Sequence, residues 1–408
     1  MTIHQVQSRS IYHGLPVYPK ELKGLTAIIT GANGISGYHM LRVLAQDPDR
    51  WTKIYCLSRR PPAIPGGLPS NAEHIALDLL KKPGEIAEVL KSKGVTADYV
   101  FFFAYIQVAP KPGERLWSDA EEMCRVNTAL LSNFCDSLPL ASINPKRILL
   151  QTGAKNYGAH VLPQTPKPLR ESLPRVLLAP NFYYTQEDFL AAFCATQQHT
   201  SYTITMPSYI PGAVPDAAMN VVLPLGIYAA VGAHLAEPLV YPGTAAGWRA
   251  TQCQSSAMLN AYMAEWAVFV RDEDAAGEKF NCCDGSAFTW GGLWEALAGW
   301  YGMEVLGPGD GEEWERRKMG LTAWAKTERV RRAWGEVAER WGLVHGELWD
   351  VERLFAFTEG ALGGVETDYS MDKSRKLGWF GTVDTTESIR KVLDEFAELK
   401  MIPPVPKR

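Results

Sequence analysis

The chain has 408 residues, of which 46% are hydrophobic and 21% charged, so it can bury a large core and is not a disordered protein. Its formal net charge of −4 provides no basic surplus that would favour nucleic acid or an anionic membrane surface as a partner. Seven scattered cysteines without metal-ligand spacing predict thiols in a reducing compartment rather than disulfides or a metal site. The first 18 residues lack the apolar core of a secretory signal, and the apolar segment 221–236 is too short and interrupted to span a membrane. We therefore expect a soluble, cytoplasmic protein.

The chain begins with a segment, residues 1–21, that is expected to be an irregular arm. Thr26–Thr30 is apolar and β-branched, as in a buried strand, and helical periodicity begins at Tyr38. Between them stand three glycines in the spacing G-x-x-G-x-x-G: Gly31, Gly34 and Gly37. Glycine lets the backbone approach a pyrophosphate closely, and a helix N-terminus offers N–H groups and a partial positive charge. This arrangement predicts a dinucleotide site, although an ordinary glycine-containing βα turn would show the same spacing.

A second strand is expected over Lys53–Ser58, and Arg59 and Arg60 follow it directly. In an NAD-binding fold this position usually carries an acidic residue that binds the ribose hydroxyls. Two guanidinium groups suit the 2′-phosphate of NADP instead, and a solvated basic turn is the alternative interpretation. We predict NADPH/NADP as the cofactor.

Further strands and helices alternate along the chain. The expected strands are His74–Asp78, Tyr99–Tyr105 and Arg147–Gln151, and the expected helices are Glu85–Lys93 and Glu121–Leu138. This alternation predicts an α/β fold with a doubly wound parallel sheet of the Rossmann type. Ligands of such sheets bind outside the carboxyl ends of the strands, so Asp78 and Leu79 are placed to bound the adenine.

The candidate catalytic residues follow the fifth strand. Short-chain dehydrogenases place a tyrosine and a lysine four residues apart on one helix, where the ammonium lowers the tyrosine pKa for proton transfer. Here Glu187 stands four residues after Tyr183, and Asp188 four residues after Tyr184. Either the site is inactive, or the lysine has moved upstream to Lys155 in the segment T-G-A-K-N-Y.

These segments resemble the progesterone 5β-reductase / iridoid synthase-like (PRISE) group of the short-chain dehydrogenase/reductase superfamily. That group has its lysine in TG-x-K-x-Y and its tyrosine in N-F-Y-Y-x-x-E-D, matched here by 152–157 and 181–188. The resemblance implies that Lys155 and the second tyrosine, Tyr184, are the catalytic residues. Segments 206–212, 280–281 and 372–381 also resemble the group.

The fold and the resemblance together imply a binding site for the cofactor and the substrate, and no metal is expected. The cofactor-binding residues would be Gly31, Asn33, Gly34, Ile35, Gly37, Ser58, Arg59, Arg60, Asp78, Leu79, Ala104, Thr152, Lys155, Tyr184, Pro207, Ser208 and Ile210. The substrate side would be lined by Tyr105, Tyr157, Met219, Phe355 and Phe357, of which the two phenylalanines could equally be core residues. Met206 replaces the group's usual arginine, and 104–107 replaces a tryptophan-containing turn, so steroid or monoterpene specificity does not carry over.

The resemblance implies an extended short-chain dehydrogenase with two parts. Residues 22–212 would form the NADP-binding Rossmann domain, to which a later strand near 278–284 returns. Residues 213–408 would form a smaller, mostly helical lobe that covers the substrate. Trp334, Val337 and Trp341 have the spacing of a helix core, and 221–236 could be a surface helix that joins two subunits of a homodimer or packs within the lobe.

The activity implied by the resemblance is NADPH-dependent reduction of the activated C=C bond of an enone or enal in a small apolar carbonyl-containing molecule. Hydride would add to the β-carbon, Tyr184 would stabilise the charge on the oxygen, and Lys155 would bind the nicotinamide ribose. The same residues could serve a carbonyl reductase or alcohol dehydrogenase. A cyclase or isomerase that retains its cofactor without net redox chemistry, and a binding protein that senses redox state, are further alternatives.

Overall fold

A computed structural model describes residues 5–110, 117–162, 164–216, 219–309, 319–364 and 366–406. The chain divides into two compact units. Unit 1 comprises Met1–Ser208, Ala257–Cys283 and Tyr369–Thr382, and unit 2 comprises Tyr209–Ser256, Asp284–Asp368 and Val383–Arg408. The division lies close to the expected boundary at 212, and two later segments, not one strand, return to unit 1.

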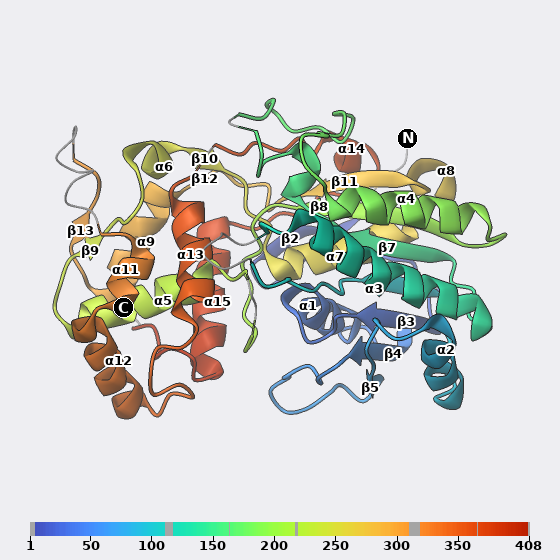
Figure 1. The fold of residues 1–408 in the computed structure, drawn as a ribbon, viewed down its shortest axis with the longest axis horizontal. Helices are drawn as coiled ribbons and strands as arrows, with labels where there is room; N and C mark the ends of the chain where they lie inside the picture. Colours follow the sequence, from blue (N-terminus) through green and yellow to red (C-terminus); the bar gives the residue numbers. More distant parts are fainter. Residues whose placement is uncertain are drawn as a thin grey trace. The chain divides into compact units, whose positions relative to one another are not determined.

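Unit 1 is built on a seven-stranded parallel sheet with the strand order β11-β8-β7-β6-β3-β4-β5 (Figure 1). The strands are β3 (Leu25–Thr30), β4 (Trp51–Ser58), β5 (Ala72–Ala76), β6 (Tyr99–Phe102), β7 (Arg147–Gln151), β8 (Ser201–Pro207) and β11 (Glu278–Cys282). The central strands are almost wholly buried, as expected for a parallel sheet covered on both faces. The predicted doubly wound α/β fold is confirmed.

Four strands have other bounds than the sequence analysis expected: β3 and β4 begin earlier, β5 begins and ends earlier, and β6 ends earlier. β6 ends at Phe102 and not at Tyr105, because the N–H groups of Phe103 and Ala104 donate to the side chain of Thr30, at 3.1 and 3.2 Å, instead of to backbone carbonyls of a neighbouring strand. β5 ends at Ala76, so Asp78 lies in the loop beyond it.

Helices form a layer on each face of this sheet (Figure 1). Because the crossovers are right-handed, α1, which connects β3 to β4, lies on one face of the sheet, and the helices that precede β6, β7 and β8 lie on the other face. One layer contains α1 (Ile35–Leu44) and α7 (Ala257–Phe269), which pack together. The other layer contains α2 (Pro83–Ser92), α3 (Ala120–Leu140) and α4 (Phe182–Ala195). Two short helices, α8 (Asp272–Ala275) and α14 (Asp372–Lys376), complete unit 1. A 3₁₀ turn, η1 (Ala154–Tyr157), follows β7.

The N-terminal segment is not the irregular arm that we expected. β1 (Val6–Arg9) and β2 (Tyr12–Pro16) pair as an antiparallel hairpin. Tyr12 and Leu15 are buried, and the Tyr12 ring lies 5.7 Å from the ring of Tyr262 on α7. The hairpin belongs to unit 1 because it buries this apolar surface, which the short and weakly alternating sequence did not reveal.

Unit 2 is mostly helical and is organised around α5 (Val222–His234). Its other elements are β9 (Leu239–Val240), α6 (Ala245–Arg249), β10 (Thr251–Gln252), β12 (Phe288–Thr289), α9 (Trp290–Tyr301), β13 (Val305–Leu306), α11 (Leu321–Lys326), α12 (Glu328–Trp341), α13 (Val351–Leu362) and α15 (Thr385–Glu398). The expectation of a surface helix over 221–236 was wrong, because residues 222–232 of α5 are all buried. α12 buries Trp334 and Val337 as expected, whereas Trp341, at its end, is 45% exposed.

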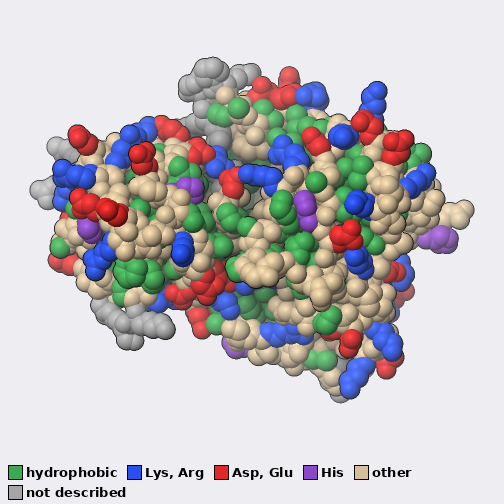
Figure 2. All heavy atoms as spheres, turned by 90° about the horizontal axis from the view of Figure 1, so that it is seen from below, with side chains coloured by type: hydrophobic (Ala, Val, Ile, Leu, Met, Phe, Trp, Pro, Cys, Tyr) green, Lys and Arg blue, Asp and Glu red, His purple; other side chains and the backbone are tan. Residues whose placement is uncertain are grey.

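Among the described residues, no helix has the length and apolarity needed to cross a bilayer, and no three His, Cys, Asp or Glu side chains gather as metal ligands would. None of the seven cysteines, all of which the structure describes, forms a disulfide. Basic and acidic side chains are interspersed over the face drawn in Figure 2.

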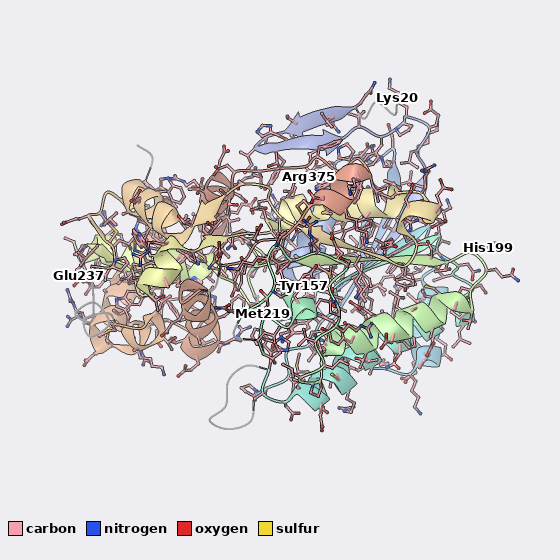
Figure 3. The ribbon with its side chains drawn as sticks, turned by 90° about the horizontal axis from the view of Figure 1, so that it is seen from above. Lys20, Tyr157, His199, Met219, Glu237 and Arg375 are labelled. Atoms are coloured by element: carbon pink, nitrogen blue, oxygen red, sulfur yellow. The ribbon has the colours of Figure 1, made fainter. Side chains whose placement is uncertain are left out.

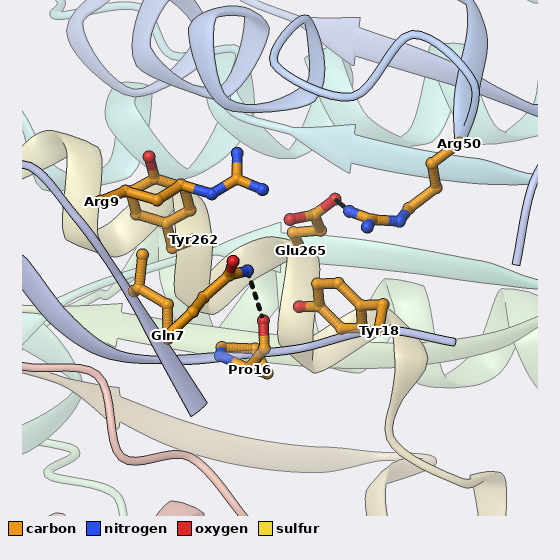
Figure 4. Close-up of a pocket in the computed structure, with 8 residues that line it drawn as sticks. Gln7, Arg9, Pro16, Tyr18, Arg50, Tyr262 and Glu265 are labelled. Carbon is orange, nitrogen blue, oxygen red and sulfur yellow. Dashed lines mark hydrogen bonds and ion pairs between the residues drawn. The ribbon is translucent and has the colours of Figure 1, made fainter. Parts of the chain in front are cut away.

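A buried ion pair fixes the α7 side of unit 1 (Figure 4). Glu265, on α7, accepts hydrogen bonds from Arg50 Nη1 at 2.9 Å and from Trp51 Nε1 at 2.7 Å. The Arg50 guanidinium lies 4.4 Å from the centre of the Tyr18 ring. Burial raises the pKa of the Glu265 carboxyl, and the charge of Arg50 opposes this shift. The adjoining cavity of about 10 Å³ has room for about one water molecule.

We expect Glu265→Ala to lower the stability of the protein, because it removes the buried carboxylate that binds Arg50 and Trp51 and leaves Arg50 with the more exposed Asp47 as its counter-charge. Breaking such a pair typically costs about 3–5 kcal/mol. Glu273→Ala is the matched control, since Glu273 also pairs with an arginine but is 66% exposed. The thermal unfolding midpoint should fall by several degrees for the first variant and stay near wild type for the second. Equal midpoints for the two variants would contradict this account.

Candidate active site

The glycine loop connects β3 to the N-terminus of α1. Gly31 has a φ of +64°, and a Cβ atom there would lie 2.9 Å from the Ala104 nitrogen. A Cβ atom on Gly37 would lie 2.4 Å from the Gly31 carbonyl oxygen, so glycine allows α1 to pack against the loop. Gly34 is the N-cap of α1, and neither a capping side chain nor an acidic first turn covers the N–H groups that follow. These residues fit the phosphates of a dinucleotide.

The predicted adenosine side lies at the same edge of the sheet. β4 pairs with β3 in parallel, with Leu57 opposite Thr30, so Ser58 and the two exposed arginines, Arg59 and Arg60, follow at the edge that carries the glycine loop. The Ser58 hydroxyl donates to the Arg60 carbonyl at 2.7 Å, which orders this turn. The structure therefore places Arg59 and Arg60 at the same edge of the sheet as the glycine loop.

The remaining predicted cofactor residues occupy loops at the ends of other strands. Asn33 and Ile35 flank the N-cap of α1 and are half-buried. Beyond β5, Asp78 Oδ1 accepts from the Leu80 N–H at 3.0 Å, and the Leu79 carbonyl accepts from Asn133 on α3 at 3.3 Å.

On the other half of the edge, the Thr152 N–H donates to the Thr205 carbonyl at 2.8 Å, which extends the β7–β8 pairing by one residue. Pro207 ends β8, and Ser208 follows it in unit 1. Ile210 lies in unit 2. The unit 1 residues of the prediction thus stand at the ends of neighbouring strands.

Lys155 lies on η1, directly after β7. Its ammonium is 3.8 Å from the centre of the Trp117 ring and 5.6 Å from the centre of the Phe182 ring. Burial between these rings lowers the pKa of Lys155 to about 7, and the nearby Cys124 thiol acts weakly against the shift. The side chain can therefore exchange a proton near neutral pH.

Tyr184 does not occupy the position that the sequence analysis gave it. Its hydroxyl donates to the Asn156 carbonyl at 2.8 Å and accepts from the Val176 N–H at 2.9 Å. The residue is 6% exposed, and the Arg175 guanidinium lies 4.9 Å from the centre of its ring. The single phenolic proton is used within the fold, so this geometry does not suit a donor to a substrate.

Tyr183 points to the end of the sheet instead. A Cβ atom on Gly153 would lie 3.2 Å from the Tyr183 hydroxyl and 3.2 Å from the Pro207 carbonyl. The hydroxyl is therefore close to the ends of both β7 and β8, where parallel sheets bind ligands. Burial raises the pKa of Tyr183 and keeps the phenol protonated. Adjacent helical residues point about 100° apart, which is why the two tyrosines have different surroundings.

Tyr105 and Tyr157, both predicted to face the substrate, have different environments. The Tyr105 ring is 5.7 Å from the Phe182 ring, and its hydroxyl accepts from Trp117 Nε1 at 3.0 Å and donates to Gln107 at 2.5 Å. Tyr105 thus belongs to the cluster around Lys155. Tyr157 is 4% exposed inside unit 1 (Figure 3), and its hydroxyl donates to Asn281 Oδ1 at 2.6 Å. Tyr157 is a structural residue, and its assignment to the substrate side is corrected.

The other predicted substrate residues belong to unit 2. Phe355 has no exposed surface and lies in the core of this unit, so it does not line a substrate site. Phe357 packs edge-on against Tyr209 at 5.7 Å. Met219 is half-buried.

Asn127 is a residue that the sequence analysis missed. From α3, its Oδ1 accepts from the Ile106 N–H at 2.9 Å, and its Nδ2 donates to the Ile106 carbonyl at 3.0 Å. These two bonds fix the loop that carries Tyr105. An asparagine within the apolar stripe of Val126 and Leu130 was the available signal, because a buried amide requires partners.

Comparison with known proteins identifies the family. A model of the PRISE-like Rossmann-fold domain matches residues 27–403. The chain belongs to this family. The predicted resemblance is thereby confirmed, and the protein is an enzyme of the short-chain dehydrogenase/reductase superfamily.

Two relatives of the chain are similar in sequence, and one solved structure is similar in fold. The chain is 31% identical to an (S)-8-oxocitronellyl enol synthase of Camptotheca acuminata, covering 92% of this chain and 93% of that one. It is 29% identical to the 3-oxo-Delta(4,5)-steroid 5-beta-reductase of Arabidopsis thaliana, again covering 92% and 93%. The PRISE-like chain also matches the crystal structure of a UDP-glucuronic acid 4-epimerase from Bacillus cereus, with a TM-score of 0.58, 13% identity and coverage of 92% and 100%. The structural match shows a shared fold.

We expect the Lys155 amine to react with an acylating reagent near neutral pH, because only the unprotonated amine is nucleophilic and its pKa is about 7. Lys53 is the internal control, since its pKa is raised by a hydrogen bond to Glu73. Competitive labelling read by mass spectrometry should show a midpoint near pH 7 for Lys155 and a much higher midpoint for Lys53. Similar midpoints for both lysines would show that Lys155 is not desolvated.

Proposed function

We propose that this enzyme uses NADPH to reduce the activated C=C bond of an enone or enal in a small apolar molecule. The observation that carries the proposal is that the Tyr183 hydroxyl lies against Gly153, just beyond the end of β7 and two residues before the buried amine of Lys155. Family membership and the relative named as a 3-oxo-Delta(4,5)-steroid 5-beta-reductase support the reaction class.

The cofactor site is proposed from the residues that fit it. A nicotinamide dinucleotide supplies a hydride when it is bound. The α1 N-terminus, with Gly34 as its N-cap, would hold the pyrophosphate, and Arg59 and Arg60 would hold a 2′-phosphate. These two guanidinium groups are the reason for proposing NADPH over NADH.

Tyr183 is the proposed hydrogen-bond donor to the substrate carbonyl. Reduction at the β-carbon of an enone places negative charge on the carbonyl oxygen, which a fixed O–H donor stabilises. Because burial raises the Tyr183 pKa, the phenol still carries its proton when that charge develops. This proposal replaces Tyr184 with its neighbour and keeps Lys155 as the adjacent cation.

The surroundings of Lys155 determine whether it is charged near neutral pH. Its ammonium rests on the faces of Trp117 and Phe182, which attract a cation but exclude water. In the protonated state it favours negative charge on nearby oxygen atoms. We propose that Lys155 orients the polar groups of the cofactor beside Tyr183.

Tyr183→Phe should lower the turnover of enones by about a hundredfold, as loss of one oxyanion donor typically does, without changing NADPH affinity. Tyr184→Phe is the comparison variant: it loses the bond from Val176 and the bond to Asn156 in the Lys155 turn, so it should cost stability and lower turnover much less than Tyr183→Phe. The assay follows NADPH absorbance with a panel of enals, enones and saturated ketones.

Product identification in that assay distinguishes the alternatives. A saturated carbonyl product supports the proposal, whereas an allylic alcohol would identify a carbonyl reductase. Conversion of substrate without net NADPH consumption would identify a cyclase or isomerase. Wild-type turnover by Tyr183→Phe would remove Tyr183 from the mechanism.

The double variant Arg59→Ala/Arg60→Ala should raise the KM for NADPH by roughly tenfold or more, since each charge-assisted hydrogen bond to phosphate contributes about 1.5–3 kcal/mol. The KM for NADH should change little, because NADH has no 2′-phosphate. Steady-state kinetics with both cofactors provide the test, with Lys81→Ala, an exposed residue beyond β5, as the charge control. An equal rise for both cofactors would argue against NADPH recognition by these arginines.

A further inference from the structure

Glu187 is a buried carboxylate with partners from three other segments. Its side chain is 3% exposed. Oε1 accepts from Asn156 Nδ2 on η1 at 2.9 Å, and Oε2 accepts from Arg175 at 3.0 Å and from Lys279 on β11. The acid therefore joins α4 to η1, to the loop before α4, and to the edge strand of the sheet.

Glu187 occupies a notable position in α4. Glu187 stands four residues after Tyr183, where other short-chain dehydrogenases have the lysine that accompanies the tyrosine. In that arrangement one helix sets the distance between phenol and amine. Here the amine is on η1, a separate four-residue turn, so hydrogen bonds must supply the rigidity that a shared helix would have provided.

Helix α4 contacts η1 through three side chains. Asn181 Nδ2 donates to the Lys155 carbonyl at 2.9 Å, and the Tyr184 hydroxyl donates to the Asn156 carbonyl at 2.8 Å. Glu187 binds the Asn156 side chain, whose amide also donates to Thr152 Oγ1 at 2.8 Å. Glu187 differs from the other two because it fixes a side chain of the turn and ties it to β7.

We propose that Glu187 is a positioning residue that fixes the Lys155 turn to the helix carrying Tyr183. This inference rests on the proposed function for its kinetic consequence, and on the contacts of Glu187 for its structural one. A neutral side chain could accept from Asn156, but it would remove the carboxylate that Lys279 binds and leave Arg175 with the exposed Asp188 as its counter-charge. The two cations explain why a carboxylate occupies the buried position.

The structural arm of the test is hydrogen exchange in the protein without added cofactor. The reporters are the Asn156 N–H, bonded to the Gly153 carbonyl at 2.9 Å, and the Gly158 N–H, bonded to the Lys155 carbonyl at 3.0 Å. Glu187→Ala should speed exchange at both by roughly tenfold or more while the amides of α4 keep their protection. Unchanged exchange at 156 and 158, or an equal rise throughout unit 1, would overturn the proposal.

The kinetic arm compares matched variants in the NADPH assay. Glu187→Ala should lower kcat by roughly ten- to a hundredfold with little change in KM for NADPH, because misplacement of the amine affects the chemical step. Glu187→Gln keeps an acceptor for Asn156, so it should recover most of the lost kcat. Asp188→Asn is the control, since Asp188 also pairs with Arg175 at 2.8 Å but is 66% exposed and has no bond to η1.

The two arms separate this inference from the proposed function. Faster exchange at 156 and 158 with an unchanged kcat would show a structural link without a positioning role, and would overturn the proposal. If the wild-type enzyme reduces no enone or enal, the proposed function fails, and the exchange result still decides whether Glu187 holds the turn.

Discussion

The candidate site depends on the hydrogen bonds that hold η1 against α4. β7 delivers Lys155 to the edge of the sheet, and α4 delivers Tyr183, but these segments are 28 residues apart in sequence. Asn181, Tyr184 and Glu187 each bond to η1 from the same helix that carries Tyr183. These bonds connect the turn that carries Lys155 to the helix that carries Tyr183.

Burial shifts the pKa values of Lys155 and Tyr183 in opposite directions, but in both cases it favours the uncharged form. It lowers the pKa of Lys155 to about 7 and raises that of Tyr183, so each uncharged form is favoured. A neutral phenol is the form that donates a hydrogen bond to a developing oxyanion. Burial removes water from the Lys155 ammonium, and the faces of the Trp117 and Phe182 rings attract the cation and offset part of that loss. The protonation of Lys155 therefore still responds to a nearby negative charge.

Six of the seven strands of the sheet were expected from the sequence, and β7 matched at both ends. β8 was missed, because Ser201, Thr203 and Thr205 interrupt its apolar run. The glycine loop was predictable because Gly31 and Gly37 sit where a side chain would collide with backbone. Tyr183 and Tyr184 could not be told apart, because the choice depends on how α4 rotates against η1. Phe355 and Tyr157 were misplaced for a related reason: an aromatic residue near a site has the same sequence signature whether it faces a ligand or the core.

Because the lysine of this chain is on η1, the position four residues after Tyr183 on α4 can carry a different side chain. A lysine four residues after Tyr183 would need open space toward the cofactor, whereas Glu187 is directed inward to Arg175, Lys279 and Asn156. Substituting lysine for Glu187 would therefore put a third cation beside Arg175 and Lys279 and would not create a Tyr-x-x-x-Lys site. In this chain the acid and the lysine are linked, since Glu187 binds Asn156 in the turn that carries Lys155.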